Sequence, residues 1–284
     1  MNSFTDYNSN SSKKGIILAL VLWILFFLSV TVLTLSFRNR LSIKLRSLYN
    51  QQMQMHYLAK EGINRAIIKL AQDDNNFDSR SEVWAEDFTL QKEQGLLLCK
   101  VVDEDRFINI NTATEEMLEN IQLIFPQISL QNIEKLIKNR PFNINGEIKA
   151  IINQDKEDFN LIQPQTTSIE DLVTTFSDGR ININTAPREV LLMIPGIKEI
   201  TVDTIINHRD IEAFIANETL SEDLSLLGLS AAQVSALIKY VKVDSAVFRI
   251  AAQAVSKTKN ISKNINLVLQ RKDHKFKMLM FQEN

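Results

Sequence analysis

Residues 15–37 read GIILALVLWILFFLSVTVLTLSF, an uncharged stretch that follows Lys14 and ends before Arg38. At about 1.5 Å per residue, a helix over residues 16–37 is about 33 Å long, enough to cross the hydrocarbon core of a membrane. We therefore expect one transmembrane helix there. A secretory signal peptide is not expected, because its apolar core is shorter and it ends at an Ala-x-Ala-like site.

The segment before this helix is a polar leader, Met1 to Lys14, and Gly15 separates it from Ile16. A small residue between a basic leader and an apolar helix resembles the site that a prepilin peptidase cuts. Two interpretations stay open: a leader of residues 1–15 that is removed, or an uncleaved signal anchor. The basic residues around the span, taken alone, place the C-terminal bulk in the cytoplasm, because more of them follow the span than precede it.

The composition of the 284 residues narrows the classes of function. The formal net charge is −2, so no basic excess favours nucleic acid. The single cysteine, Cys99, excludes an intrachain disulfide and a cysteine-based zinc site. His56, His208 and His274 are scattered without catalytic or metal-binding spacing, so we expect no enzyme, no cofactor and no metal. The acidic run Asp103–Asp105 is interpreted as a solvated turn, with a divalent cation site as the alternative.

The helical pattern continues beyond the membrane segment, since residues 38–75 contain no proline and one glycine. Apolar or small residues recur every three or four positions and predict a narrow seam on one face of the helix. Small residues at Ala59, Gly62 and Ala66 allow a sheet or another backbone to approach closely. We expect this helix to pack on one side of a globular head, with a dimeric coiled coil as the alternative.

Two regions of β pattern flank a long helical block. Residues 83–102 break at Gln94–Gly95, which predicts a hairpin, and the chain from Val241 onward returns to β periodicity. We predict an α+β fold, in which the long helix packs on a small antiparallel sheet. The sheet is built from residues 76–107 and 241–284, and an all-α domain over residues 108–240, SAM-like or helix-hairpin-helix-like, is inserted between its strands.

The helical block contains an internal repeat. ININTATEEML at residues 108–118 recurs as ININTAPREVL at residues 181–191. Each copy is followed by a proline and a second helical pattern that ends at an arginine, over residues 126–140 and 195–209. The first copy is longer before its proline by about one helical turn, which keeps the buried face in register. The repeat predicts two helical hairpins.

The repeated residues are typical of the start of a helix. Thr112 and Thr185 are expected to cap the first helix of each hairpin, because their hydroxyl groups can accept a bond from an early helical N–H. Glu115 is expected to complete a capping box with Thr112, and Pro187 to occupy the first turn.

Asn111 and Asn184 are expected to bond the backbone in the entry strand of each hairpin, a role that needs no ligand. Pro195 and Gly196 are expected to form the turn of a helix-hairpin-helix, an element that often binds DNA phosphates. Basic and acidic residues balance over residues 180–210, so this segment lacks the net positive charge that favours phosphate binding. We therefore expect this hairpin to pack against protein, and nucleic acid is not an expected partner.

Together these features resemble the general secretion pathway protein K family, the large minor pseudopilins of type II secretion systems. The resemblance covers nearly the whole chain. It rests on Gly15–Ile16, Tyr57–Ala59, Trp84, Asp103–Glu104, the two Asn-Thr-Ala motifs, Asp178–Arg180, Pro195–Gly196 and residues 245–250.

The resemblance implies cleavage after Gly15 and methylation of the new amino terminus at Ile16. Most pilin-like proteins have a glutamate where this chain has Leu20, and its absence is similar to the K subunit, which is placed at the pseudopilus tip. The family implies a single-pass protein of the inner membrane with its bulk in the periplasm, which reverses the orientation from the charge count.

The implied partners are protein I- and J-type minor pseudopilins, the major pseudopilin, the inner-membrane secretion platform and the prepilin peptidase. We expect the other minor pseudopilins to bind the seam from Leu41 to Leu70. Charged substitutions at Ala59 and Ala66 should then abolish this binding while the head stays folded. The alternatives are a membrane-tethered DNA receptor for DNA uptake and a minor pilin of a type IV pilus.

Overall fold

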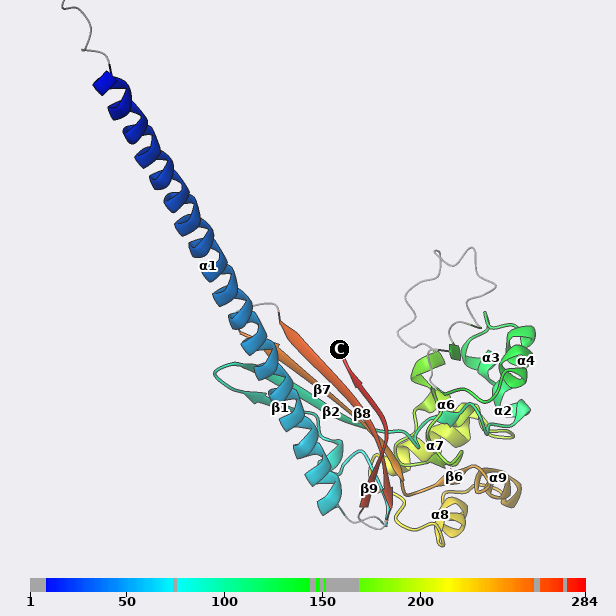
Figure 1. The fold of residues 1–284 in the computed structure, drawn as a ribbon. Helices are drawn as coiled ribbons and strands as arrows, with labels where there is room; N and C mark the ends of the chain where they lie inside the picture. The colour runs from blue at the N-terminus through cyan, green and yellow to red at the C-terminus, as the bar shows by residue number, and fades with distance from the viewer. Residues whose placement is uncertain are drawn as a thin grey trace, which may run out of the picture. The chain divides into compact units, whose positions relative to one another are not determined.

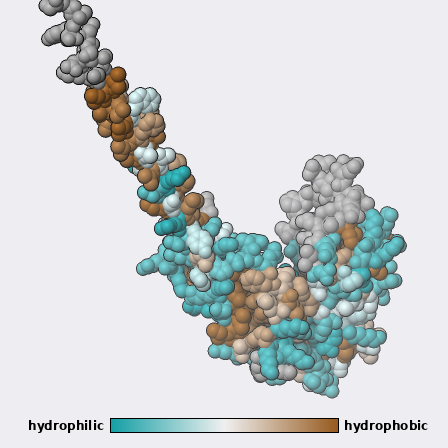
Figure 2. Space-filling model, in the orientation of Figure 1, coloured by the Kyte–Doolittle hydropathy of each residue, from teal (hydrophilic) through white to brown (hydrophobic). Residues whose placement is uncertain are grey.

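The computed structural model describes residues 9–73, 76–143, 147–148, 151, 169–257, 261–272 and 275–284. The chain divides into two compact units, Met1–Gln54 and Met55–Asn284, and helix α1 (Ser9–Gln72) begins in the first and ends in the second. In the first unit, side chains from residue 15 to residue 46 are exposed, and Figure 2 shows a hydrophobic surface along the N-terminal part of this stretch, followed by hydrophilic residues. Its most apolar window has a mean hydropathy of 3.0, so length and composition suffice to cross a membrane.

The second unit contains a five-stranded antiparallel sheet in the order β1-β2-β7-β8-β9 (Figure 1). Its strands are β1 (Phe88–Gln91), β2 (Gly95–Asp103), β7 (Val247–Ser256), β8 (Ser262–Lys272) and β9 (Lys275–Glu283). The first two form the predicted hairpin, and the last three come from the C-terminal β region. Because β2 pairs with β7, the helical block is an insertion between two neighbouring strands, as predicted.

The C-terminal part of α1 covers one face of this sheet. Its buried apolar residues pack on alternate residues of β2, β7 and β8: Met55, Leu58, Ala59, Ile63, Ala66 and Leu70. Four of them belong to the predicted seam, and Leu58 and Ile63, which lie beside it, were not predicted. A Cβ at Gly62 would lie 3.0 Å from both methyl carbons of Leu97, so glycine at this position lets helix and strand approach closely. Trp84, in the short helix η1 (Val83–Ala85), closes the same core and meets Phe248 edge to face.

The seam differs from the prediction at its start and in what it binds. Leu41 and Leu45 are 47% and 56% exposed, so the buried stripe begins only at Met55. Ala59 and Ala66 are completely buried in the core of their own head. The expectation that these two alanines contact other subunits is therefore wrong, since a charge at either position would disrupt the head itself.

The insertion has its own hydrophobic core, separate from the core under α1. Its helices are α2 (Glu115–Glu119), α3 (Ile121–Ile124), α4 (Leu130–Lys138), η3 (Ile169–Asp171), α6 (Arg188–Leu192), α7 (Glu199–Arg209), α8 (Leu220–Leu226) and α9 (Ala231–Leu237). It is not purely helical. Two short parallel pairs, β3 (Ile108–Asn109) with β4 (Val173–Thr174) and β5 (Ile181–Asn182) with β6 (Val241–Lys242), hold its ends.

The two copies of the repeat fold into related hairpins. In the second copy α6 leads through a turn to α7, and in the first copy α2 leads to α4. The extra residues of the first copy do not lengthen one helix. They form the separate short helix α3, because α2 ends at its C-cap, Asn120. The amide Nδ2 of Asn120 donates to Met193 O at 3.1 Å and so ties the first hairpin to the second.

Candidate functional site

The proposed cleavage position lies inside α1. Around Gly15, no atom in the part of the chain that the structure describes lies within 4 Å of an added Cβ, so packing does not require glycine there. Ile16 and Leu20 are 67% and 57% exposed. Cleavage and methylation at Gly15 and Ile16 remain predictions from the resemblance.

The second Asn-Thr-Ala motif lies at the centre of a buried polar network. Asn182 accepts the N–H of Asn184 (2.9 Å), and its Nδ2 donates to Asp78 O (2.9 Å) and to Ser245 Oγ (2.7 Å). Asn184 donates to Phe214 O (2.8 Å) and accepts Phe214 N (2.9 Å). The motif thus bonds the backbone of segments far away in the sequence. Asn184 bonds backbone groups as expected, but they are those of Phe214 and not of the entry strand.

The first copy repeats this geometry. Asn109 Oδ1 accepts the N–H of Asn111 (2.9 Å). Asn111 in turn donates to Phe142 O (2.9 Å) and accepts Phe142 N (2.7 Å). Each repeat therefore uses its second asparagine to hold the chain that follows the hairpin's second helix.

The two threonines do not cap helices, and that prediction is wrong. The N-cap of α2 is Thr114, whose Oγ1 accepts Met117 N at 3.2 Å, so the expected box of Thr112 and Glu115 is absent. Pro187 is itself the N-cap of α6, one position before the first turn. Thr185 instead donates its hydroxyl to Asp103 Oδ2 at 2.6 Å. The helix starts later in each motif than expected because a tight turn precedes it, in which the carbonyl oxygens of Asn109 and Asn182 accept Ala113 N (2.8 Å) and Ala186 N (2.9 Å).

The turn of the second hairpin is built as the sequence suggests. Pro195 is buried, and Gly196 has φ +77°, a conformation that favours glycine. A Cβ on Gly196 would lie 3.9 Å from Ala236 of α9, so this turn lies against a neighbouring helix of the insertion. Near it, Arg188 pairs with Asp203 at 3.0 Å.

The acidic run Asp103–Asp105 is buried, and its interpretation as a solvated turn is wrong. The three residues are 2%, 0% and 0% exposed. Asp103 accepts hydrogen bonds from Thr185 Oγ1, Ser245 Oγ and its neighbour's backbone, Asp105 N (2.6, 2.6 and 2.8 Å). Its side-chain donors are neutral, and burial raises the pKa of its carboxyl group.

The other two acids of the run have cationic partners. Glu104 pairs with Arg249 at 2.7 Å, and Asp105 pairs with Lys242 at 3.2 Å. Asp105 also accepts Ala246 N at 2.6 Å. The run therefore fastens the end of β2 to β7 and to β6, where the insertion joins the sheet.

A further pair of charges was not foreseen from the sequence. Arg271 of β8 donates to both carboxylate oxygens of Asp78 at 2.7 Å and to Asp73 at 2.8 Å, and its guanidinium lies 4.7 Å from the Phe248 ring centroid. Asp78 also accepts Ser245 N at 2.7 Å. An arginine within a β pattern was the available signal, but its partners lie far away in the sequence.

One acidic group has the spacing of metal ligands: oxygens of Asp73, Asp78 and Glu82 lie within 4.8 Å of one another. The guanidinium of Arg271 already bonds the first two of these carboxylates. Glu82 accepts Ser79 N at 2.6 Å, and burial and the nearby Asp73 raise its pKa to about 7. These carboxylates therefore have donors within the chain, since Arg271 bonds Asp73 and Asp78, and Glu82 accepts from Ser79 N and Trp84 Nε1, which does not fit a metal site.

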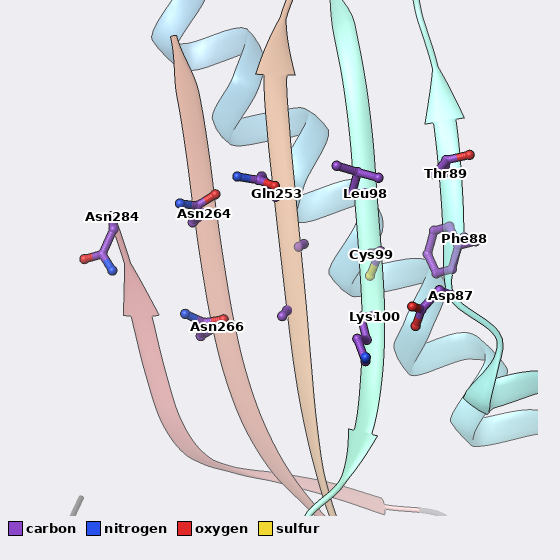
Figure 3. A pocket seen from close by; sticks show the side chains of 12 residues that line it. Asp87, Phe88, Thr89, Leu98, Cys99, Lys100, Gln253, Asn264, Asn266 and Asn284 are labelled. Atoms are coloured by element: carbon purple, nitrogen blue, oxygen red, sulfur yellow. The ribbon is translucent and has the colours of Figure 1, made fainter. Parts of the chain in front are cut away.

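The sheet face away from α1 carries a shallow hollow of about 420 Å³. Figure 3 shows amide side chains on it from neighbouring strands, Gln253 of β7 and Asn264 and Asn266 of β8, together with Asn284. Cys99 lies beneath, buried in the core under α1, and burial raises the pKa of its thiol to about 11.

A long N-terminal helix that packs on an antiparallel sheet, with a mixed insertion between two strands, is a pseudopilin-like fold. A chain in the crystal structure of the GspK-GspI-GspJ complex of the enterotoxigenic Escherichia coli type 2 secretion system is similar to this chain. The TM-score is 0.60 at 14% identity, and the match covers 85% of this chain and 99% of that chain. No protein-family model and no curated protein matches the sequence.

Proposed function

We propose that this chain is a K-type minor pseudopilin that caps the pseudopilus of a type II secretion system. The observation that carries the proposal is the fold match, which extends over 85% of this chain and therefore includes the insertion as well as the helix and sheet. The motifs that resemble the protein K family lie in the same regions. In this proposal the chain is anchored in the inner membrane and its sheet and insertion lie in the periplasm.

The position at the tip rests on two features. Leu20 stands where most pilin-like proteins have a glutamate that neutralises the amine of a neighbouring subunit, and a carboxylate without such a partner would be costly in hydrocarbon. The insertion is a second folded body with its own core, and it enters and leaves between β2 and β7. Such a body would obstruct a subunit stacked above it, so contacts are expected only below.

The surface for these contacts is the exposed part of the seam rather than the buried part. Leu41, Leu45 and Tyr49 are 47%, 56% and 63% exposed and recur every four positions, so they lie on one face of α1. An apolar face of this kind suits the equivalent helix of another minor pseudopilin. We assign the I- and J-type partners to it.

A crosslinking experiment tests the proposal. A photoreactive amino acid at position 45 should crosslink the full-length chain to the other minor pseudopilins in secreting cells, and each product should contain one copy of this chain. Position 64, exposed on the same helix within the head, is the matched control. A ladder of products that contain this chain repeatedly would place it along the shaft and overturn the tip assignment.

A further inference from the structure

The hollow on the sheet face away from α1 is lined by side chains that the strand register brings together. One row crosses four neighbouring strands, and its directly paired members are Thr89, Leu98, Gln253 and Asn264. A second row, two positions along the strands, contains Lys100, Ala251 and Asn266. The residues between the two rows face the other way and are buried in the core under α1: Cys99, Ala252 and Ile265. Because neighbouring strands lie about 4.8 Å apart, the first row is roughly 14 Å long.

The hollow forms where a small residue stands between longer ones. Ala251 lies between Lys100 of β2 and Asn266 of β8 in the second row, so the centre of this face is left open (Figure 3). Leu98, which is 40% exposed, adds an apolar surface in the first row. The volume of about 420 Å³ lies within the range of about 300–1,000 Å³ that is typical of small-molecule sites.

Three amide side chains dominate the polar chemistry of the hollow. Among the residues that the structure describes, none forms a hydrogen bond through the side-chain amides of Gln253, Asn264 and Asn266. Gln253 is exposed and Asn266 is half-buried, and each of these amides can both donate and accept. Asn264 Oδ1 is inaccessible to solvent, so Asn264 offers only the donors of its Nδ2. The hollow therefore presents donors and acceptors that the chain itself does not use.

The lining of the hollow has no net charge. Its charged residues are Asp87 and Lys100, one of each sign, and both lie at the end near β1 and β2. An ion of either sign would meet one charge that repels it, and elsewhere in the hollow it would exchange its water for uncharged amides, which is unfavourable. The lining therefore suits a neutral ligand.

We propose that this hollow binds a neutral oligosaccharide. Each sugar hydroxyl group both donates and accepts a hydrogen bond, which matches the amides of Gln253 and Asn266. The C–H face of a sugar ring is apolar and packs on Leu98 and Ala251. The first row, roughly 14 Å long, accommodates a short chain of sugar rings laid across the strands.

A sugar fits this place better than a peptide. Extended peptides bind a sheet at its edge, where unpaired backbone groups are available. Strands β2, β7 and β8 each pair on both sides, so their backbone groups are already used within the sheet. The free groups of the hollow belong to side chains, and they suit a ligand whose hydroxyl groups project from a flat ring.

Saturation-transfer-difference NMR on the full-length chain tests the site, in a polyoxyethylene detergent that carries no sugar. The probes are two neutral trisaccharides, cellotriose and triacetylchitotriose, which differ in their N-acetyl groups. We expect at least one of them to bind with a dissociation constant of about 1 mM or below. Tighter binding of triacetylchitotriose would identify an amino-sugar polymer as the source, and tighter binding of cellotriose a polymer of plain hexoses. A blocked trialanine peptide should give no signal.

Variants of the lining residues locate the binding in the hollow. Gln253→Ala and Asn266→Ala should each weaken it about tenfold, because each removes hydrogen bonds to the sugar. Ala251→Leu fills the centre of the hollow and should abolish binding. Gln91→Ala is the matched control, since it removes an exposed amide on the same face of β1, two positions beyond Thr89 and outside the hollow. It should keep the full affinity.

Three outcomes would overturn the assignment. They are the absence of a signal from either trisaccharide at about 5 mM, several-fold above the expected dissociation constant, equal binding by the wild type and Gln253→Ala, and a stronger signal from the peptide than from either sugar. The Gln253 side chain is exposed, so Gln253→Ala should leave Tm unchanged, and its loss of binding would then report the site rather than the fold.

Discussion

Two hydrogen bonds join Asn184 to Phe214: the side-chain Nδ2 of Asn184 donates to Phe214 O at 2.8 Å, and its Oδ1 accepts Phe214 N at 2.9 Å. A side chain that bonds both the N–H and the C=O of a buried residue takes the place of the backbone partner that a neighbouring strand would supply. The same pair of hydrogen bonds joins Asn111 to Phe142.

Asn184→Ala should therefore destabilise the head by about 2–3 kcal/mol, because it leaves a buried N–H and a buried C=O without partners. Asn111→Ala should cost less, since Asn111 is only half-buried and water can replace the lost bonds. Chemical denaturation monitored by Trp84 fluorescence would measure both. Equal midpoints for Asn184→Ala and the wild type would contradict the structural role.

Stability should depend on pH through Glu82. Its pKa lies near 7 in the folded protein, above its ordinary 4.5, so the folded state binds more protons between these values. The contribution is complete below pH 4.5 and is lost as pH rises through about 7. Glu82→Gln should remove this pH dependence and raise stability at pH 8 by about 1 kcal/mol, allowing for partial exposure. Unchanged pH dependence of Tm in this variant would refute the assignment.

Ala66→Glu and Leu45→Glu should separate folding from assembly. Ala66 is completely buried, so Ala66→Glu places a charge in the core and should lower stability by about 4 kcal/mol. Leu45 is 56% exposed, so Leu45→Glu should leave Tm unchanged and weaken co-purification with other minor pseudopilins. Normal co-purification of Leu45→Glu would argue against the proposed contact face.

Leader removal is tested by intact mass. We expect the membrane-extracted protein to begin at a methylated Ile16 in cells that contain the prepilin peptidase, and at Met1 in cells without it. Gly15→Leu should block the cut without changing the fold, because space around Gly15 is open. A mature protein that still begins with Met1 in the presence of the peptidase would remove the main support for a pseudopilin.

The full-length chain in detergent should not bind duplex DNA with sub-micromolar affinity at physiological salt. Around the second hairpin, Arg188 is paired with Asp203 and Arg209 is buried, and the exposed cations Arg180 and Lys198 are balanced by the exposed acids Glu199 and Asp210. Fluorescence anisotropy with a labelled duplex is the measurement. Tight binding that falls steeply with added salt would revive the DNA-receptor alternative.

The sequence predicted features that depend on local periodicity. The seam at Ala59, Gly62 and Ala66 identified the face of α1 that meets the sheet, because small residues at helical spacing matter only where another backbone comes close. The order of β hairpin, insertion and C-terminal strands followed from changes of period.

The sequence did not predict the hydrogen bonds and ion pairs between residues far apart in the chain. Thr185 resembled a helix cap in its local sequence, but its hydroxyl bonds Asp103, 82 positions away. Asp103–Asp105 resembled a solvent-exposed turn because its partners, Ser245, Lys242 and Arg249, come from the other side of the insertion. A composition window contains no information about such distant partners.

The bond between Asp103 and Ser245 joins positions 142 residues apart at the place where the insertion leaves and re-enters the sheet. Closing so long a loop before its contents are ordered carries a large entropic cost and slows the pairing of β2 with β7. If the insertion folds first, its parallel strand pairs bring both ends together and the sheet then closes as a short-range event. The insertion would thus set the order of assembly of the head, and variants that loosen its core should slow refolding of the sheet itself.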